Sequence, residues 1–274
     1  MQIPDTFSQI FRFFPLHTFP AINPRSGKSP SGPTLWINPP PSNTSRLSTD
    51  VECLKWQAYL ALRGLAKIAV RCDISPQGAM GGRLPNLHLA NGQLLPAQLI
   101  PTWADEVLEE QERPLEGYKD QAALDESRAW VSLLEGDVHS ALLIAQPVPS
   151  YFMSLITFPQ APFRPLESIV LPPPPPLSGL TSLLPAFGTR VDPKHIESKY
   201  RAGISAIASR LGADKWFLGS SEPTPLDALI FAYLHSILYN TANHMVRIEV
   251  TRHVNLVAWE LRVRDLVSVA FTRS

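Results

Sequence analysis

The sequence predicts a mixed α/β unit followed by an all-helical region. Strand and helix patterns alternate in the first part, which includes a hairpin that begins at Pro85 and turns at Asn91-Gly92. Beyond that part the chain shows helical periodicity and helix-capping pairs, and almost no strand pattern. We therefore expect two domains, an α/β domain over residues 1–112 and a helical domain over residues 113–274.

Composition excludes several classes of site and partner. The 274 residues carry 24 basic and 24 acidic side chains, without the Lys/Arg runs that mark nucleic-acid binding. Two cysteines are too few for a disulfide framework, and the 7 histidines lack metal-ligand spacing. We expect no nucleic-acid partner, no metal and no cofactor. A bilayer span takes about 20 apolar residues, which no segment supplies, so any membrane association is expected to be peripheral.

Proline marks the segments expected to be loop or extended chain. Of the 28 prolines, nine lie in residues 1–50 and twelve in residues 147–193. Proline interrupts helices and central strands. We predict a long loop over 22–47, in which Leu35-Trp36-Ile37 is an isolated apolar island, and a Pro-rich insertion over 147–191.

The first domain is expected to contain a strand, a helix and a second strand. Leu16 to Phe19 is predicted as the first strand, stopped by Pro20. Thr49 and Glu52 have the spacing of a capping box at a helix start, and Gly64 fits the helix end. Lys67 to Ile74 is β-rich. A right-handed unit with parallel strands is therefore expected.

A hairpin and a helix complete this domain. Pro85 begins the first hairpin strand, where a missing N–H is tolerated. Asn91-Gly92 suits a two-residue type I′ turn, because both residues accept a positive φ. The segment 103–111 is predicted to be a helix with an acidic outer face.

The second domain is expected to be built from long helices. The pattern over 121–145 predicts one of them. Asp192-Pro193 predicts the start of another, with an N-cap followed by an N1 proline. Thr224 and Asp227 form a cap-and-return pair at a third helix start. The segment 253–271 supplies one or two closing helices.

The chain resembles the glutathione-transferase fold, in which a thioredoxin-like domain precedes a helical domain. The resemblance rests on Leu84-Pro85-Asn86-Leu87 with Asn91-Gly92, and on Trp216-Phe217-Leu218-Gly219 with Thr224-Pro225-Leu226-Asp227. It implies a cis peptide bond before Pro85, beside the ligand site. It says little about activity, because one fold carries many functions.

The residues that bind glutathione in that family do not carry over. The family follows its second hairpin strand with Glu-Ser or Gln-Ser, where this chain has Pro96-Ala97. Ala97 has no hydroxyl, and Pro96 has neither a carboxylate nor an N–H. The family's Tyr, Ser or Cys after the first strand is replaced by Phe19-Pro20-Ala21-Ile22. We therefore expect no catalytic residues and no enzymatic activity.

A second resemblance is to the metaxins. Residues 50–60, Asp-Val-Glu-Cys-Leu-Lys-Trp-Gln-Ala-Tyr-Leu, are similar to the first-helix signature of that family. Residues 13–20 and the loop after them look most like the smaller fungal metaxin-like subunit of the mitochondrial sorting and assembly machinery.

The metaxin resemblance implies a location and a set of partners. It implies a non-enzymatic subunit, peripheral to the mitochondrial outer membrane on its cytosolic face. Such a subunit caps the β-barrel insertase subunit beside a second metaxin-like subunit. It helps to recognise β-barrel precursors through their C-terminal signal.

Other readings stay open. The chain could be a soluble scaffold module of the same fold, or a divergent glutathione transferase with a non-standard site. Phe11, Phe13, Phe14 and Trp36 are candidate partner-binding residues, because exposed aromatic side chains are frequent interface hot spots. The phenylalanines could instead pack on the chain's own core.

Overall fold

The computed structural model describes residues 32–40, 45–74, 78–109, 115–145, 192–239 and 244–273. The strand predicted at 16–19, the candidate residues Phe11, Phe13 and Phe14, and the Pro-rich insertion 147–191 lie outside the described residues. Within the described part of the chain, no helix combines the length and the apolar character that crossing a membrane requires.

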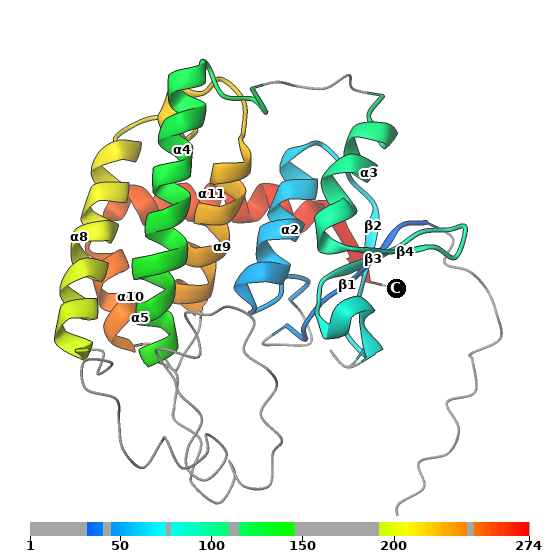
Figure 1. The fold of residues 1–274 in the computed structure, drawn as a ribbon, viewed down its shortest axis with the longest axis horizontal. Helices are drawn as coiled ribbons and strands as arrows, with labels where there is room; N and C mark the ends of the chain where they lie inside the picture. Colours follow the sequence, from blue (N-terminus) through cyan, green and yellow to red (C-terminus); the bar gives the residue numbers. More distant parts are fainter. Residues whose placement is uncertain are drawn as a thin grey trace, which may run out of the picture.

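Within the described residues, five short strands form one mixed sheet in the order β4-β3-β1-β2-β5 (Figure 1). Strand β1 runs parallel to β2 and antiparallel to β3, β3 pairs antiparallel with β4, and β5 runs parallel to β2. The strands are β1 (Thr34–Trp36), β2 (Ile68–Arg71), β3 (Asn86–His88), β4 (Leu94–Pro96) and β5 (Phe271–Arg273).

The central strand corrects the sequence analysis. Strand β1 lies inside the segment 22–47, so the prediction of a loop throughout that segment is wrong for residues 34–36. Leu35 is opposite Val70 on one side and Leu87 on the other, and all three are buried. The apolar island Leu35-Trp36-Ile37 thus supplies most of the central strand of the sheet. Its sequence resembles a loop because the strands that pair with it are distant in sequence.

Helix α2 (Val51–Leu62) lies between the sheet and helix α9 (Pro225–Tyr239) (Figure 1). Its N-cap is Asp50, whose Oδ2 accepts a hydrogen bond from the Cys53 N–H at 2.9 Å. The predicted capping box of Thr49 and Glu52 is therefore displaced by one residue. Glu52 instead accepts from Lys55 Nζ at 2.5 Å. The predicted helix end is confirmed, because Gly64, with φ 82°, lies just beyond the last residues of α2.

The hairpin is present, but its turn differs from the prediction. Leu89 N–H donates to the Gln93 carbonyl oxygen at 2.8 Å, and Gly92 N–H donates to the Leu89 carbonyl oxygen at 3.0 Å. Gly92 has φ 86°, whereas Asn91 is not among the residues with positive φ. The loop therefore has three residues with a left-handed glycine at its end, and the two-residue type I′ turn is wrong. The Leu84–Pro85 peptide bond is cis, as the resemblance implies.

Helices account for most of the remaining described chain. The helix predicted over 121–145 is confirmed as one continuous run with a π-helical stretch in its middle. Asp192 caps α8 (Pro193–Leu211) as predicted, by accepting from the Lys194 N–H at 3.0 Å. The elements are η2 (Met80–Gly82), η3 (Ala97–Leu99), α3 (Ile100–Val107), α4 (Gln121–Leu133), η4 (Leu134–Val138), α5 (His139–Ile144), α8 (Pro193–Leu211), η6 (Phe217–Gly219), α10 (His244–Thr251) and α11 (Val254–Val269).

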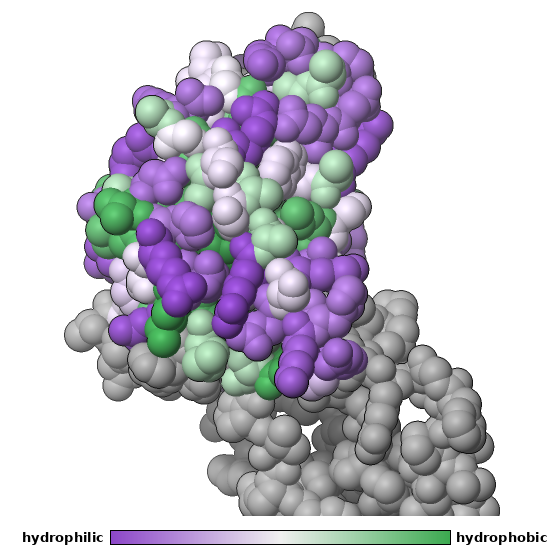
Figure 2. Space-filling model, turned by 90° about the vertical axis from the view of Figure 1, so that its left-hand side faces the viewer, coloured by the Kyte–Doolittle hydropathy of each residue, from purple (hydrophilic) through white to green (hydrophobic). Residues whose placement is uncertain are grey.

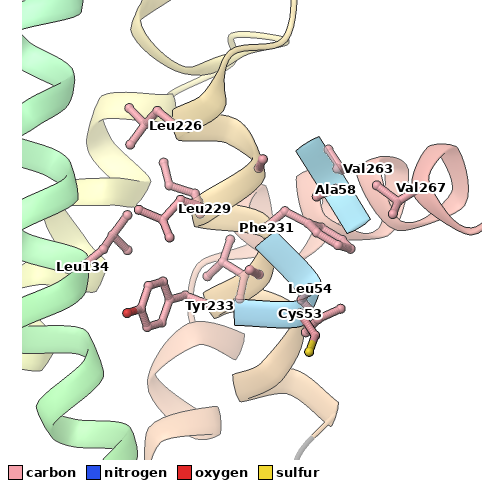
Figure 3. Packing of buried hydrophobic residues seen from close by; sticks show 14 of the residues in the cluster. Cys53, Leu54, Ala58, Leu134, Leu226, Leu229, Phe231, Tyr233, Val263 and Val267 are labelled. Carbon is pink, nitrogen blue, oxygen red and sulfur yellow. The ribbon is translucent and has the colours of Figure 1, made fainter. Parts of the chain in front are cut away.

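Helix α9 is the centre of the core. Its residues from Leu226 to Ile237 are all buried, which explains an apolar pattern without a polar face. Figure 3 shows Phe231 lying beside α2, while Leu229 and Tyr233 extend toward the side on which Leu134 lies. One continuous core therefore joins the sheet domain to the helical domain.

The chain returns to the sheet after α11, which the sequence analysis did not predict. Ile68 N–H donates to the Ala270 carbonyl oxygen at 3.2 Å, and Phe271 is fully buried in β5. Residues 271–273 thus belong to the sheet of the first domain, although the predicted boundary assigns them to the helical domain over 113–274.

Candidate functional site

The junction between β4 and η3 is where this fold would present a ligand-binding helix start. Pro96 precedes η3 with φ −70° and ψ 162°, and no side chain caps the turn. Proline has no backbone N–H, and the Ala97 side chain is a methyl group, so neither residue can hydrogen-bond a carboxylate or an ammonium group through its side chain. The Pro96 and Ala97 side chains therefore supply no recognition groups at the junction.

The polar group nearest the start of the hairpin is used by the chain itself. Asn86 is buried, with 1% of its surface exposed. Its Oδ1 accepts from the Met80 N–H at 2.8 Å, and its Nδ2 donates to the Pro85 carbonyl oxygen at 3.0 Å. Asn86 therefore fixes the η2 turn against the hairpin. No local sequence pattern marks this role, because Asn86 follows Pro85 without any cap or turn signal.

Trp36 lies on the sheet next to this hairpin. Its ring meets the His88 ring edge-on, with 5.5 Å between the centroids, and Arg71 Cζ is 5.9 Å from the Trp36 ring centre. Arg71 is held in turn by Asp73, with Nε to Oδ1 at 2.6 Å. Trp36 is partly buried rather than fully exposed. Its assignment as a partner-binding residue stays a prediction.

Cys53 is unsuited to nucleophilic chemistry. Its side chain is fully buried, and the Asn38 N–H lies 3.5 Å from its Sγ. Burial raises the pKa of the Cys53 thiol, and the nearby Asp50 carboxylate raises it further, so the reactive thiolate is disfavoured. Among the described residues, no group of three or more His, Cys, Asp or Glu could hold a metal ion.

Thr224 and Asp227 form the predicted helix-capping pair at the start of α9. Thr224 N–H donates to Asp227 Oδ2 at 2.8 Å, and the Thr224 hydroxyl donates to the same oxygen at 2.7 Å. The other oxygen, Oδ1, accepts from the Phe217 N–H at 2.9 Å. Burial raises the pKa of Asp227 to about 6. Asp227 therefore joins η6 to α9, and its role is structural.

A hollow lies elsewhere, among α5, α8 and α10. It has a volume of about 490 Å³ and a mostly apolar lining. Figure 2 looks onto the α8 side of the molecule, where apolar residues emerge between hydrophilic ones. No local sequence pattern marks this hollow, because three helices that are separate in sequence supply its walls.

Comparisons with known proteins agree with this architecture. Residues 200–263 match the family described as glutathione S-transferase, C-terminal domain. The β-etherase LigF from Sphingobium sp. strain SYK-6 superposes with a TM-score of 0.50 at 14% identity, covering 86% of this chain and 98% of that chain. The chain has a glutathione-transferase-like fold. The predicted fold class is thereby confirmed.

Other solved structures are similar at the same low identity. A glutathione S-transferase from Methylobacterium radiotolerans, solved with glutathione sulfonate, has a TM-score of 0.49 at 16% identity and covers 88% of this chain and 96% of that chain. Rice GST1, solved with glutathione, has a TM-score of 0.49 at 12% identity, with 88% and 91% covered. No curated protein sequence matches this chain. At these identities the likeness is one of fold.

Proposed function

We propose that this chain is a non-enzymatic subunit of the mitochondrial outer-membrane machinery that sorts and assembles β-barrel proteins. The observation that carries the proposal is the β4–η3 junction. The fold retains the cis-proline hairpin, but Pro96 and Ala97 supply no carboxylate or hydroxyl for a glutathione molecule. A scaffold that keeps its shape without its ligand groups is better suited to binding partners than to transferring glutathione.

The proposed place is the cytosolic face of that membrane, with peripheral attachment. The subunit caps the β-barrel insertase subunit, lies beside a second metaxin-like subunit, and helps to recognise the C-terminal signal of precursors. Support comes from the metaxin-like segment 50–60, which spans the N-cap and most of α2. Within it, Cys53 and Leu54 are fully buried, so this part of the signature serves the core rather than chemistry.

A soluble scaffold module of the same fold is the second candidate. It is compatible with the fold and with the balanced charge of 24 basic and 24 acidic residues. The two candidates differ in where the chain is found. The assembly subunit sediments with mitochondria and is released from the membrane by alkaline carbonate, whereas the scaffold module stays in the cytosolic fraction.

Co-purification tests the proposal. A tagged chain is expressed at its native level, mitochondria are solubilised in a mild detergent, and the bound proteins are identified by mass spectrometry. We expect a β-barrel membrane protein and a second metaxin-like protein at comparable amounts. Recovery of the chain alone, or with cytosolic partners only, would contradict the proposal.

A further inference from the structure

The hollow among α5, α8 and α10 has the features of a ligand site, and it is separate from the β4–η3 junction. Its volume of about 490 Å³ lies within the range of about 300–1,000 Å³ that encloses small ligands. Figure 1 shows that these helices lie on the side of the molecule away from the sheet. A ligand there would not occupy the position of glutathione.

The floor of the hollow is apolar, although a tyrosine forms part of it. Tyr200 is 2% exposed, and its hydroxyl donates to the Val246 carbonyl oxygen at 2.6 Å. That bond satisfies the hydroxyl and ties α8 to α10, so the ring faces the hollow as an apolar surface. Val246 and Ala141 beside it are also buried. The floor therefore favours hydrocarbon over a polar ligand.

One end of the hollow is apolar as well. The last turn of α5 and the first turns of α8 and α10 meet there, with Ile144, Ile196 and Met245 among the lining residues. Met245 is 66% exposed, an unusual exposure for a large apolar side chain. Methionine adapts its shape readily and is frequent at surfaces that bind apolar ligands.

Two arginines, Arg201 and Arg252, also line the hollow. Arg201 lies eight residues along α8 from Pro193, which is about 12 Å at the rise of an α-helix, and Arg252 follows the end of α10. Arg201 Nη2 donates to Glu197 Oε1 at 2.5 Å, and Arg252 Nη1 donates to Glu249 Oε2 at 2.8 Å. Each guanidinium has five N–H donors, so these bonds orient it and leave donors for an anion.

We propose that this hollow binds one acyl chain of an anionic amphiphile, with the hydrocarbon on the Tyr200 floor and a carboxylate or phosphate headgroup at Arg201 and Arg252. The apolar lining and the two arginines match the two parts of such a molecule. Glu197 and Glu249 neutralise much of the charge of the two arginines, so affinity comes mainly from burying the acyl chain of the ligand. Each added methylene should strengthen binding roughly fourfold until the hollow is full.

Displacement of cis-parinarate from the delipidated full-length chain tests the proposal. Decanoate, dodecanoate and tetradecanoate should bind with affinities that rise roughly fifteenfold per two methylenes, then level off. Lysophosphatidate distinguishes a phosphate headgroup from a carboxylate. Saturable binding of either amphiphile with this chain-length dependence supports the proposal. Absence of saturable binding to the full-length chain overturns it, including the case in which the chain's own residues fill the hollow.

One pair of single variants and one double variant locate the site. Ile196→Trp fills the hollow and should weaken dodecanoate binding at least tenfold, whereas Val254→Trp, at a position 77% exposed outside the lining, should leave binding unchanged. The double variant Arg201→Gln/Arg252→Gln should weaken dodecanoate binding roughly tenfold and leave dodecanol binding unchanged. Circular dichroism confirms that each variant folds. Equal effects of Ile196→Trp and Val254→Trp, or equal losses of dodecanoate and dodecanol binding in the double arginine variant, would overturn the assignment.

Discussion

Arg46 donates from Nη1 to the carbonyl oxygen of Phe271 at 2.7 Å, which ties the segment before α2 to the last strand. The bond lies between residues 225 positions apart in sequence. It occupies a backbone oxygen on β5, a strand at the edge of the sheet, where unpaired backbone groups otherwise remain open to other strands. Strand β5 is thus held by its pairing with β2 and by Arg46.

Phe271→Ala should therefore destabilise the whole chain. Phe271 is fully buried, and removing a buried aromatic ring costs about 3–5 kcal/mol in free energy of unfolding. The measurement is urea unfolding followed by circular dichroism. Val269→Ala, at a position 79% exposed, serves as the control and should change stability by no more than about 0.5 kcal/mol. Equal stability of Phe271→Ala and the wild type would show that β5 does not contribute to the fold.

Asp227→Asn should lower stability at neutral pH by about 1–3 kcal/mol. Asparagine has one acceptor oxygen instead of two, so either Phe217 N–H or Thr224 N–H loses its buried acceptor. Asp265→Asn, at a side chain 75% exposed, is the matched control with little expected effect.

The pH dependence of the same variant gives a second test. Burial raises the pKa of Asp227 from 3.8 to about 6 in the folded chain, so between these values the folded state holds a proton that the unfolded state has lost. The contribution of Asp227 to stability should therefore fall as pH rises through this window. In Asp227→Asn that part of the pH dependence should disappear. Parallel profiles for the two proteins would contradict the role of burial.

Glu126 predicts the opposite pH dependence. Arg210 donates from Nε to Glu126 Oε1 at 2.7 Å and from Nη2 to Oε2 at 3.1 Å, and these bonds lower the pKa of Glu126 from 4.5 to about 2. The stability that the pair contributes is present above pH 4.5 and should be lost as pH falls toward about 2.

Solvent limits the size of that effect. The Glu126 and Arg210 side chains are 39% and 30% exposed, so water screens the pair and its contribution should stay below about 1 kcal/mol. Unfolding curves of Glu126→Gln and wild type at pH 5 and pH 2.5 provide the measurement. We expect the difference between them to shrink at the lower pH. A difference that grows would contradict the assignment.

Trp36→Ala should reduce the recovery of partner proteins in the co-purification experiment. Trp36 presents a partly buried ring beside His88 and Arg71, and aromatic and arginine side chains are common at the centre of interfaces. Trp130→Ala is the control, because Trp130 is also partly buried but donates to Glu126 on its own helix at 3.0 Å. Equal recovery with both variants would remove Trp36 from the candidate interface.

Local sequence patterns predict those parts of the fold that are formed by residues close together in the sequence. The capping of α8 by Asp192 and of α9 by Asp227 involves residues a few positions apart, and the sequence predicts both. The α/β-then-helical order also follows from the spacing of strands and helices. At the candidate site, Pro96 and Ala97 lie at the predicted junction, because Pro96 ends the second hairpin strand and Ala97 begins η3.

The misplaced and missed elements depend on contacts between distant residues. Strand β1 has three residues, and its identity comes from pairing with β2 and β3 rather than from its own pattern. Strand β5 is equally short and pairs with a strand about 200 residues earlier, which no local pattern reveals. The hydrogen bond from the Phe217 N–H to Asp227 also joins two separate elements. The hollow among α5, α8 and α10 likewise forms only when separate helices come together.

Glutathione binding is the most direct test of whether the fold has lost its transferase chemistry. Isothermal titration calorimetry of the purified full-length chain with millimolar glutathione, together with turnover of 1-chloro-2,4-dinitrobenzene, measures both binding and activity. We predict no saturable heat and no turnover above the uncatalysed rate, because Pro96 and Ala97 provide no side-chain partner for the ligand. Saturable binding accompanied by turnover would contradict the account and identify the chain as an active glutathione transferase.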